Sequence, residues 1–279
     1  MELFDNHAHY NDEKFDLDRE EIIKKIYESG VTKFICAGYS LESSKKALEI
    51  ANSYDFIYTT AGISPNDIPG KIQDEDLQGK SDKEKEKLFT ESIQIVDNQL
   101  QEIEKLAKNK KVLAIGEIGL DYYWNKQNKE LQKIVFIKQI ELANKLNLPI
   151  VIHTREAVMD TLDILKNIKT VIKPGVFHCC PLNIELVKEA LKLGFYISFA
   201  GPVTFKNSKN AKEIVELVPL DKMLIETDSP YLAPEPVRGT RNDSRNVKYI
   251  AEKIAEFKGV KIEEIAKNTY GNAKKIFGI

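Results

Sequence analysis

Short apolar runs alternate with amphipathic helical patterns along the whole chain. The apolar runs are mostly continuous rather than interrupted by polar residues, which is typical of parallel strands covered on both faces. Eight such runs occupy residues 3–7, 33–38, 56–62, 112–117, 150–153, 175–178, 196–199 and 223–227. The pattern therefore predicts an α/β protein built on parallel strands.

The segments between these runs repeat apolar residues at helical spacing. Leu131, Val135, Leu142 and Leu146 step by 4, 7 and 4, and a similar stripe begins at Val247. Each stripe makes one apolar helix face that can pack against a sheet. Eight strands separated by helices favour a closed (β/α)8 TIM barrel over an open sheet. No G-x-G-x-x-G motif follows the first run, so we expect neither a dinucleotide-binding fold nor a nucleotide cofactor.

We expect residues 1–279 to form one barrel domain, because α/β barrels commonly have this length. One stretch departs from the pattern, a charged insertion at about 69–89 that is rich in Lys, Asp, Glu and Gln. It has two interpretations. It is a solvated loop that leads into a long charged helix, or it covers the barrel mouth.

Composition limits the classes of partner and compartment. Lysine and arginine total 41 against 43 aspartates and glutamates, so a polyanionic substrate would need local positive groups or metal ions. Cys36, Cys179 and Cys180 form no disulfide framework, which indicates a reducing compartment. No apolar run approaches the roughly 18 residues of a membrane span, and the first strand begins too early for a signal peptide. We therefore expect a cytoplasmic protein with no membrane partner.

All four histidines of the chain and two acids stand at or just beyond the ends of strand-like runs. They are His7, His9, Glu117, His153, His178 and Asp228. The carboxyl ends of parallel barrel strands meet at one face, so these six side chains should converge there. His7 and His9 should project to the same side because the side-chain period of a strand is two.

Six donors exceed the four that one tetrahedral ion needs, so they favour two divalent ions that share a carboxylate and a water. We expect the H-x-H histidines and Asp228 to hold one ion. His153 and His178 should hold the other, with Glu117 bridging. The bridging water would act as nucleophile, with Asp228 as proton acceptor. Four imidazoles favour Zn, Mn, Co or Ni over a magnesium site built only from oxygens, although Mg remains a candidate.

Longer motifs surround these residues. They read FDNHAH at 4–9, FDLDR at 15–19, GEIGLDYYW at 116–124, IHTREA at 152–157, FHC at 177–179 and ETDSPYL at 226–232. Matching segments continue through RGTRN at 238–242 and NAKKIFG at 272–278. Together these motifs resemble the TatD family of metal-dependent deoxyribonucleases over nearly the whole chain. The resemblance implies a TIM barrel, a two-metal hydrolytic centre, cleavage of phosphodiester bonds in DNA, and the same six metal ligands.

Two segments depart from the family pattern. The family usually carries G-x-H-P-H after the third strand, where this chain has Ser64 and Asn66 in place of both histidines. If those histidines normally contact the scissile phosphate, the substrate of this chain can differ, and Ser64 becomes the candidate substrate contact. After the sixth strand, HCCPL at 178–182 replaces the usual HCFSG. Neither change affects an expected metal ligand.

Three arginines are candidate substrate contacts. Arg155, two residues beyond His153, can bind a phosphate or form a salt bridge to a loop acid. Arg238 and Arg241 can hold a nucleic-acid backbone or brace the loop that follows Asp228.

Several other residues near the strand ends are candidates for roles at this face of the barrel. Residues 122–124, Tyr-Tyr-Trp, can stack on an unpaired base or close the top of the barrel. Glu226 can orient a metal ligand from behind. Cys179 is either a small interior filler or a thiolate ligand.

Three functions remain open at this point. The first is a nuclease that acts on DNA ends or single strands. The second keeps the two metals but hydrolyses an amide or ester, such as a D-amino acid on a mischarged tRNA. The third is a non-catalytic metal-binding scaffold, against which the six donors argue because structural zinc sites use four ligands.

Overall fold

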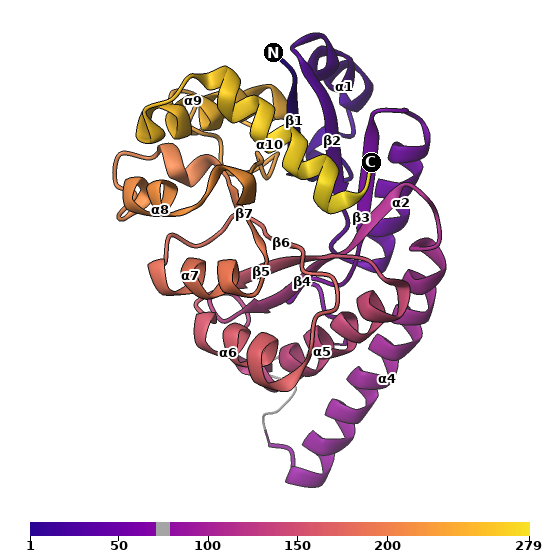
Figure 1. Ribbon diagram of the computed structural model, residues 1–279. Coiled ribbons are helices and arrows are strands. Elements are labelled where there is room, and N and C mark those ends of the chain that lie inside the picture. The colour runs from indigo at the N-terminus through magenta and orange to yellow at the C-terminus, as the bar shows by residue number, and fades with distance from the viewer. Residues whose placement is uncertain (71–78) are drawn as a thin grey trace.

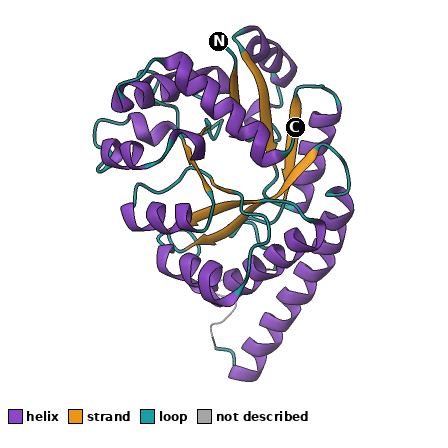
Figure 2. Ribbon diagram, viewed as in Figure 1, coloured by secondary structure: helices purple, strands orange, loops and turns teal. Residues whose placement is uncertain are grey.

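The computed structural model describes residues 1–70 and 79–279, and eight parallel strands form one sheet in sequence order from β1 to β8. Figure 1 shows the path of the chain through these strands and the helices between them. The strands are β1 Leu3–Ala8, β2 Val31–Ala37, β3 Ile57–Ala61, β4 Val112–Asp121, β5 Ile150–Arg155, β6 Val176–Phe177, β7 Tyr196–Phe199 and β8 Met223–Ile225. Figure 2 shows helices lying around the outside of these strands.

The first and last strands lie side by side. Asp228 N donates to His7 O over 2.9 Å, and His9 N donates to Ser229 O over 2.6 Å, on either side of a bridge between Ala8 and Ser229. The sheet is thus a nearly closed barrel, and the prediction of an α/β TIM barrel is confirmed. Closure brings the histidines near the start of the chain next to Asp228.

The helices follow the strands in alternation. They are α1 Arg19–Glu28, α2 Leu41–Asn52, α4 Asp82–Leu106, α5 Lys129–Leu146, α6 Val158–Asp163, α7 Ile184–Lys192, α8 Ala211–Leu217, α9 Val247–Lys258 and α10 Ile262–Phe277. Local sequence sets several of their ends: Ser40 and Ser43 form a capping box at the start of α2, and Asn147 and Gly259 end α5 and α9 in the left-handed conformation.

Strand β4 is longer than the sequence pattern predicts, because it continues past Glu117 to Asp121. The pairing of β4 with β5 shifts register between Ile115 and Ile118, and Gly119 then adopts a φ of +137°. A Cβ at Gly119 would lie 2.0 Å from the carbonyl oxygen of His153, so only glycine fits there. Strand β8, in contrast, ends at Ile225, two residues before its predicted end.

Apolar side chains form two layers. The larger core lies between the sheet and the surrounding helices. The smaller one fills the amino-terminal end of the barrel, where Phe4, Ile35, Leu113, Val151, Val176, Tyr196 and Leu224 meet Ala273, Ile276 and Phe277 of α10. The C-terminal helix thus closes one end of the barrel, and the carboxyl ends of the strands form the other.

The predicted charged insertion at 69–89 falls partly on residues 71–78, which lie outside the described residues. Beyond them, Ser81 and Glu84 form a capping box and α4 runs from Asp82 for 25 residues, which agrees with the predicted long charged helix. Among the described helices, none combines the length and the apolar composition that a membrane crossing requires.

Candidate metal centre

The H-x-H motif places two imidazoles at the carboxyl end of β1. The Nε2 atoms of His7 and His9 lie 3.2 Å apart, so the two side chains do project to one side. Across the closing seam of the barrel, Asp228 Oδ1 lies 3.2 Å from His9 Nε2 and 3.8 Å from His7 Nε2. The Nδ1 atom of His9 lies 3.2 Å from the carbonyl oxygen of Ala37, which holds its ring with Nε2 toward the cluster.

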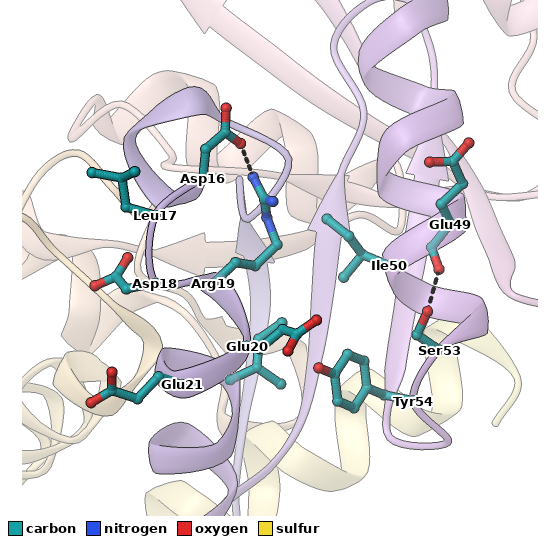
Figure 3. Close-up of a pocket in the computed structure, with 11 residues that line it drawn as sticks. Asp16, Leu17, Asp18, Arg19, Glu20, Glu21, Glu49, Ile50, Ser53 and Tyr54 are labelled. Atoms are coloured by element: carbon teal, nitrogen blue, oxygen red, sulfur yellow. Dashed lines mark hydrogen bonds and ion pairs between the residues drawn. The ribbon is translucent and has the colours of Figure 1, made fainter.

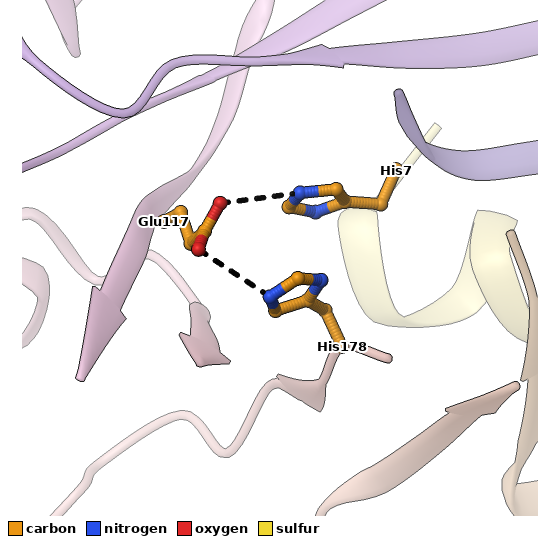
Figure 4. Close-up of side chains that lie close together, drawn as sticks. All are labelled: His7, Glu117 and His178. Carbon is orange, nitrogen blue, oxygen red and sulfur yellow. Dashed lines mark ion pairs between the residues drawn. The ribbon is translucent and has the colours of Figure 1, made fainter. Parts of the chain in front are cut away.

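Glu117 stands between two pairs of histidines. Its Oε2 lies 3.4 Å from His7 Nε2 and 3.8 Å from His9 Nε2. Its Oε1 lies 3.1 Å from His153 Nδ1 and 3.5 Å from His178 Nε2. Figure 4 shows the carboxylate of Glu117 pointing between His7 and His178. One carboxylate therefore faces both halves of the cluster, as a bridging ligand would.

The donor set fits divalent metal ions. Two groups of ligand atoms each lie within 4.8 Å of one another: His7 with Glu117 and His178, and His7 with His9 and Asp228. The second group is the set expected for one ion. The first shows that His7 reaches both halves, whereas the sequence interpretation assigned it to one.

His153 completes the second half of the cluster. Its Nδ1 lies 3.2 Å from His178 Nε2, and its Nε2 lies 2.9 Å from Asp121 Oδ2. A proton on Nε2 is therefore donated to Asp121, which leaves the lone pair of Nδ1 for an ion.

Charge coupling keeps the two acids of the cluster ionised. Burial favours the neutral acid at Glu117, but His178, His153 and His7 together hold its pKa well below the usual value. Burial likewise opposes ionisation of Asp228, and His9 lowers the pKa of that carboxyl. Ionised carboxylates with neighbouring imidazoles are the chemistry that divalent transition metals bind.

Comparison with known proteins identifies the family. The family model described as TatD related DNase matches residues 4–278. The chain belongs to the TatD family. The "Uncharacterized metal-dependent hydrolase YabD" of Bacillus subtilis is 42% identical over 277 residues, 99% of each chain. The "3'-5' ssDNA/RNA exonuclease TatD" of Shigella flexneri is 28% identical over 282 residues, again 99% of each.

A solved structure confirms the fold. The TatD homolog YJJV of Escherichia coli has a TM-score of 0.83 at 24% identity, and the match covers 99% of this chain and 98% of the other. The family match, the curated relatives and this structure together show that the chain is a metal-dependent hydrolase of the TatD family on a TIM barrel.

Asp121 is a residue of this TatD-family centre that the sequence interpretation missed. It is fully buried, and besides His153 it accepts hydrogen bonds from Asn66 Nδ2 and from the backbone N–H groups of Tyr123 and Trp124. Burial opposes ionisation, yet the hydrogen bond from His153 and its other bonds lower its pKa to about 2. The signal was present, because Asp121 follows Glu117 by four residues and strand neighbours two and four apart share a face.

Glu226 lies behind His178, as the sequence interpretation expected. Its Oε1 lies 3.3 Å from His178 Nδ1 and accepts a hydrogen bond from the Cys179 N–H, and its Oε2 accepts one from Ser198 Oγ. Burial raises the pKa of the Cys179 thiol well above its usual value, which disfavours a thiolate ligand there.

The loop that carries Asp228 is held by a buried carboxylate on β1. Asp5 accepts hydrogen bonds from the N–H and hydroxyl of Thr227 and from the hydroxyl of Ser244. Asp228 itself adopts a φ of +57°, a conformation that costs free energy in a non-glycine residue. Asp5 thereby fixes the backbone next to a strained ligand, and sequence reasoning had not singled it out.

The two positions that depart from the family motif lie at the mouth. Asn66 donates to Asp121, and Ser64 Oγ donates to Asp67 Oδ2 over 2.6 Å. Both side chains line a cavity of about 500 Å³ next to His9 and Glu117. Ser64 therefore lies beside the cluster, where a substrate would approach it.

The candidate arginines occupy different situations. Arg241 donates hydrogen bonds to both carboxylate oxygens of Asp18 and to the carbonyl oxygen of Lys14. These bonds hold the loop of Arg241 against the start of α1. Arg238 is exposed, and its guanidinium lies 4.1 Å from the centre of the Phe205 ring. Arg155 is exposed at the end of β5 and stacks on Tyr123 at 3.9 Å. Of the three, Arg155 comes from a strand that also supplies a candidate ligand.

A second cavity lies away from the strand ends. It has a volume of about 560 Å³ and runs between the start of α1 and the end of α2 (Figure 3). Arg19 and Asp16 form an ion pair in its wall, and none of the six candidate ligands lines it. The cluster at the barrel mouth, and not this surface cleft, is therefore the candidate site.

Proposed function

We propose that this TatD-family hydrolase cleaves phosphodiester bonds in DNA, on single strands or frayed ends, at a centre built from His7, His9, Glu117, His153, His178 and Asp228. The observation that carries the proposal is the position of Glu117, whose two oxygens face different pairs of histidines. Two neighbouring divalent ions need such a shared carboxylate. The similarity to a relative named as a single-stranded DNA and RNA exonuclease supports nucleic acid as the substrate.

The bound ions would supply a Lewis acid for the phosphoryl oxygen and a water acidic enough to attack it near neutral pH. The protein supplies the geometry. Asp228 is ionised and lies at the mouth beside His9, so it can accept a proton there. Glu226 and Asp121 orient His178 and His153 from behind, which fixes the nitrogens that face Glu117.

Arg155 is placed to receive negative charge. Its side chain is exposed, two residues beyond His153, and no ion pair with an acid holds it among the described residues. A guanidinium forms paired hydrogen bonds with phosphate oxygens, so Arg155 would bind a phosphate of the strand near the ions.

Cleavage of labelled single-stranded DNA in the presence of added Mn, Mg or Zn tests this function. We expect metal-dependent products that disappear with a chelator and in Glu117→Gln. Glu189→Gln is the matched control, because it makes the same exchange on the outer face of α7, where Glu189 pairs with Lys166 and Lys192. Absence of products with every metal would refute the proposal.

A second candidate, hydrolysis of an aminoacyl ester such as a D-aminoacyl-tRNA, has one observation in its favour. Asp12 and Asp67 line the cavity beside the centre, and the described residues that line it include no lysine or arginine. A carboxylate wall suits a substrate ammonium group. A panel of aminoacyl esters run beside the DNA assay separates the two candidates, and turnover of the esters alone would favour the second.

A further inference from the structure

Three side chains follow β4 at the barrel mouth, and the structure separates their roles. Tyr122 is buried, and its hydroxyl donates to Asp160 Oδ2 over 2.6 Å. Tyr123 is 44% exposed and Trp124 is 67% exposed. Tyr123 and Trp124 pack edge to face, with ring centres 4.7 Å apart, but both keep much of their surface in water. Two adjacent exposed aromatic rings on the rim of the metal centre form a surface on which a planar ligand group can stack.

Trp124 forms part of the wall of the cavity beside the centre. That cavity, of about 500 Å³, is also lined by His9 and Glu117, so a ligand in it would contact both the indole and the ligand cluster. Its volume is within the usual range of small-molecule sites. Among the residues that the structure describes, the rest of the wall comes from the rings of Tyr39 and Tyr231 and the polar side chains of Asp12, Ser64, Asn66 and Asp67.

The charge distribution shows which part of a DNA strand this cavity would take. A phosphate would be repelled by Asp12 and Asp67. Cations lie against the aromatic walls instead: Lys14 Nζ is 4.1 Å from the Tyr231 ring centre, and the Arg155 guanidinium is 5.5 Å from that of Trp124. An uncharged, planar group that donates hydrogen bonds fits the cavity, and phosphates fit its rim.

The backbone of Trp124 is also tied to the metal cluster through Asp121. The backbone N–H of Trp124 donates to Asp121 Oδ1 over 2.9 Å, and the other oxygen of that carboxylate accepts from His153 Nε2. One buried carboxylate thus fixes the platform and a candidate ligand together. A rigid platform loses little conformational entropy when a ring stacks on it.

Resting on the proposed nuclease function, we propose that this cavity is a nucleobase subsite, in which the base next to the scissile phosphate stacks on Trp124. The polar side chains of Asp12 and Ser64 in the same wall would lie beside the edge of the base. Arg155 and Lys14 hold the flanking phosphates. Stacking accepts any base because every base has a π-face, so the subsite anchors a strand end without reading its sequence.

Trp124 is the only tryptophan of the 279 residues, so tryptophan fluorescence, excited at a wavelength where the eleven tyrosines do not absorb, reports on this subsite alone. The metal-loaded protein is titrated with a cleavage-resistant phosphorothioate trinucleotide of deoxyadenosine, and separately with a trinucleotide of equal charge that lacks bases. We expect saturable quenching by the first and at least about 5-fold weaker binding of the second, from the free energy of base stacking. Equal binding of both probes, or binding that leaves the fluorescence unchanged, would overturn the proposal.

Kinetics with variants provide the second readout. Trp124→Ala should raise KM for single-stranded DNA by about 5- to 100-fold with kcat near the wild-type value, and Trp124→Phe should restore most of the loss. Tyr27→Ala is the control, because Tyr27 is 51% exposed and lies near the end of α1. An unchanged KM in Trp124→Ala refutes the subsite even if DNA is cleaved. If the protein neither cleaves DNA nor binds the trinucleotide, the nuclease function itself fails.

Discussion

The two ends of the barrel are built from the same strands but have opposite chemistry. On four neighbouring strands an apolar interior residue is followed, two positions later, by a polar one: Val151 and His153, Val176 and His178, Tyr196 and Ser198, Leu224 and Glu226. Two strand residues span about 7 Å. Within that distance the interior changes from a hydrophobic core closed by α10 to a cluster of acids, imidazoles and a hydroxyl.

This difference shows how the chain separates stability from reactivity. The closed end buries apolar side chains whose contribution scales with the area removed from water. The mouth buries acids and imidazoles that are costly unless paired or bound to metal. The same strands carry the apolar core and the candidate metal ligands. A substitution at one end of the barrel can therefore be tested for its effect on the stability or the metal binding of the other end.

The largest effect is expected at the closed end. Phe4 is 1% exposed and packs edge-on against Tyr270, so Phe4→Ala should lower the free energy of unfolding by about 3–5 kcal/mol. Denaturant unfolding measures this loss. Leu17→Ala is the control, since Leu17 is fully exposed. Phe4 is three residues from His7, yet bound metal, counted by elemental analysis, should not change. Loss of metal would show that the two ends are not independent.

The next largest effect is expected at the barrel mouth, where metal binding should stabilise the fold. Metal at about 1,000 times its dissociation constant should raise the free energy of unfolding by roughly 4 kcal/mol, because ions bind the folded state alone. His178→Ala should abolish most of this gain, since His178 faces Glu117 Oε1 at 3.5 Å. Phe4→Ala should keep it. Thermal unfolding with and without metal measures both, and an equal gain in both variants would contradict the contrast.

A smaller effect on metal affinity is expected at Asp121, which contacts the candidate ligand His153. Asp121→Asn removes the charge that accepts the His153 Nε2 proton, and it should weaken metal binding by about 10- to 100-fold. Competition with a metal-binding dye measures the affinity. Asp163→Asn, on exposed helix surface, is the matched exchange and should leave the affinity unchanged. If the two variants bind metal equally, Asp121 does not orient His153.

The smallest effect is expected on the outer surface. Ion pairs with Lys166 and Lys192 lower the pKa of Glu189 to about 2. The unfolded group titrates near 4.5, so the pairs stabilise the fold above that pH and lose their effect as the pH falls toward 2. Glu189→Gln should therefore lower Tm slightly at pH 7, and the difference from wild type should shrink between pH 4.5 and 3. A constant difference would exclude the ion pairs as its cause.

The fold followed closely from the sequence because hydrophobic runs and helical stripes depend on local periodicity. All eight strand-like runs became strands, and the expected ligands lie near the carboxyl ends of their strands except Glu117, which lies within β4. The errors fall where local pattern is insufficient. Asp121 was missed because β4 was predicted to end at Glu117, and the run through Gly119 becomes strand only when it pairs with β5 beside His153. The sharing of His7 by both halves of the cluster was likewise not predicted.

The order of residues along the chain determined the strand positions, the face on which each histidine projects, and the family motifs that imply a metal-dependent hydrolase. Tertiary structure alone decided which atoms meet. Asp228 reaches His9 across 219 residues of chain only because β8 closes against β1, and Trp124 lies in the wall of the same cavity as His9, with its backbone N–H bonded to Asp121. Periodicity sets a side chain's direction from its own strand. Distances between strands depend on how the barrel closes, because that closure is a property of all eight strands together.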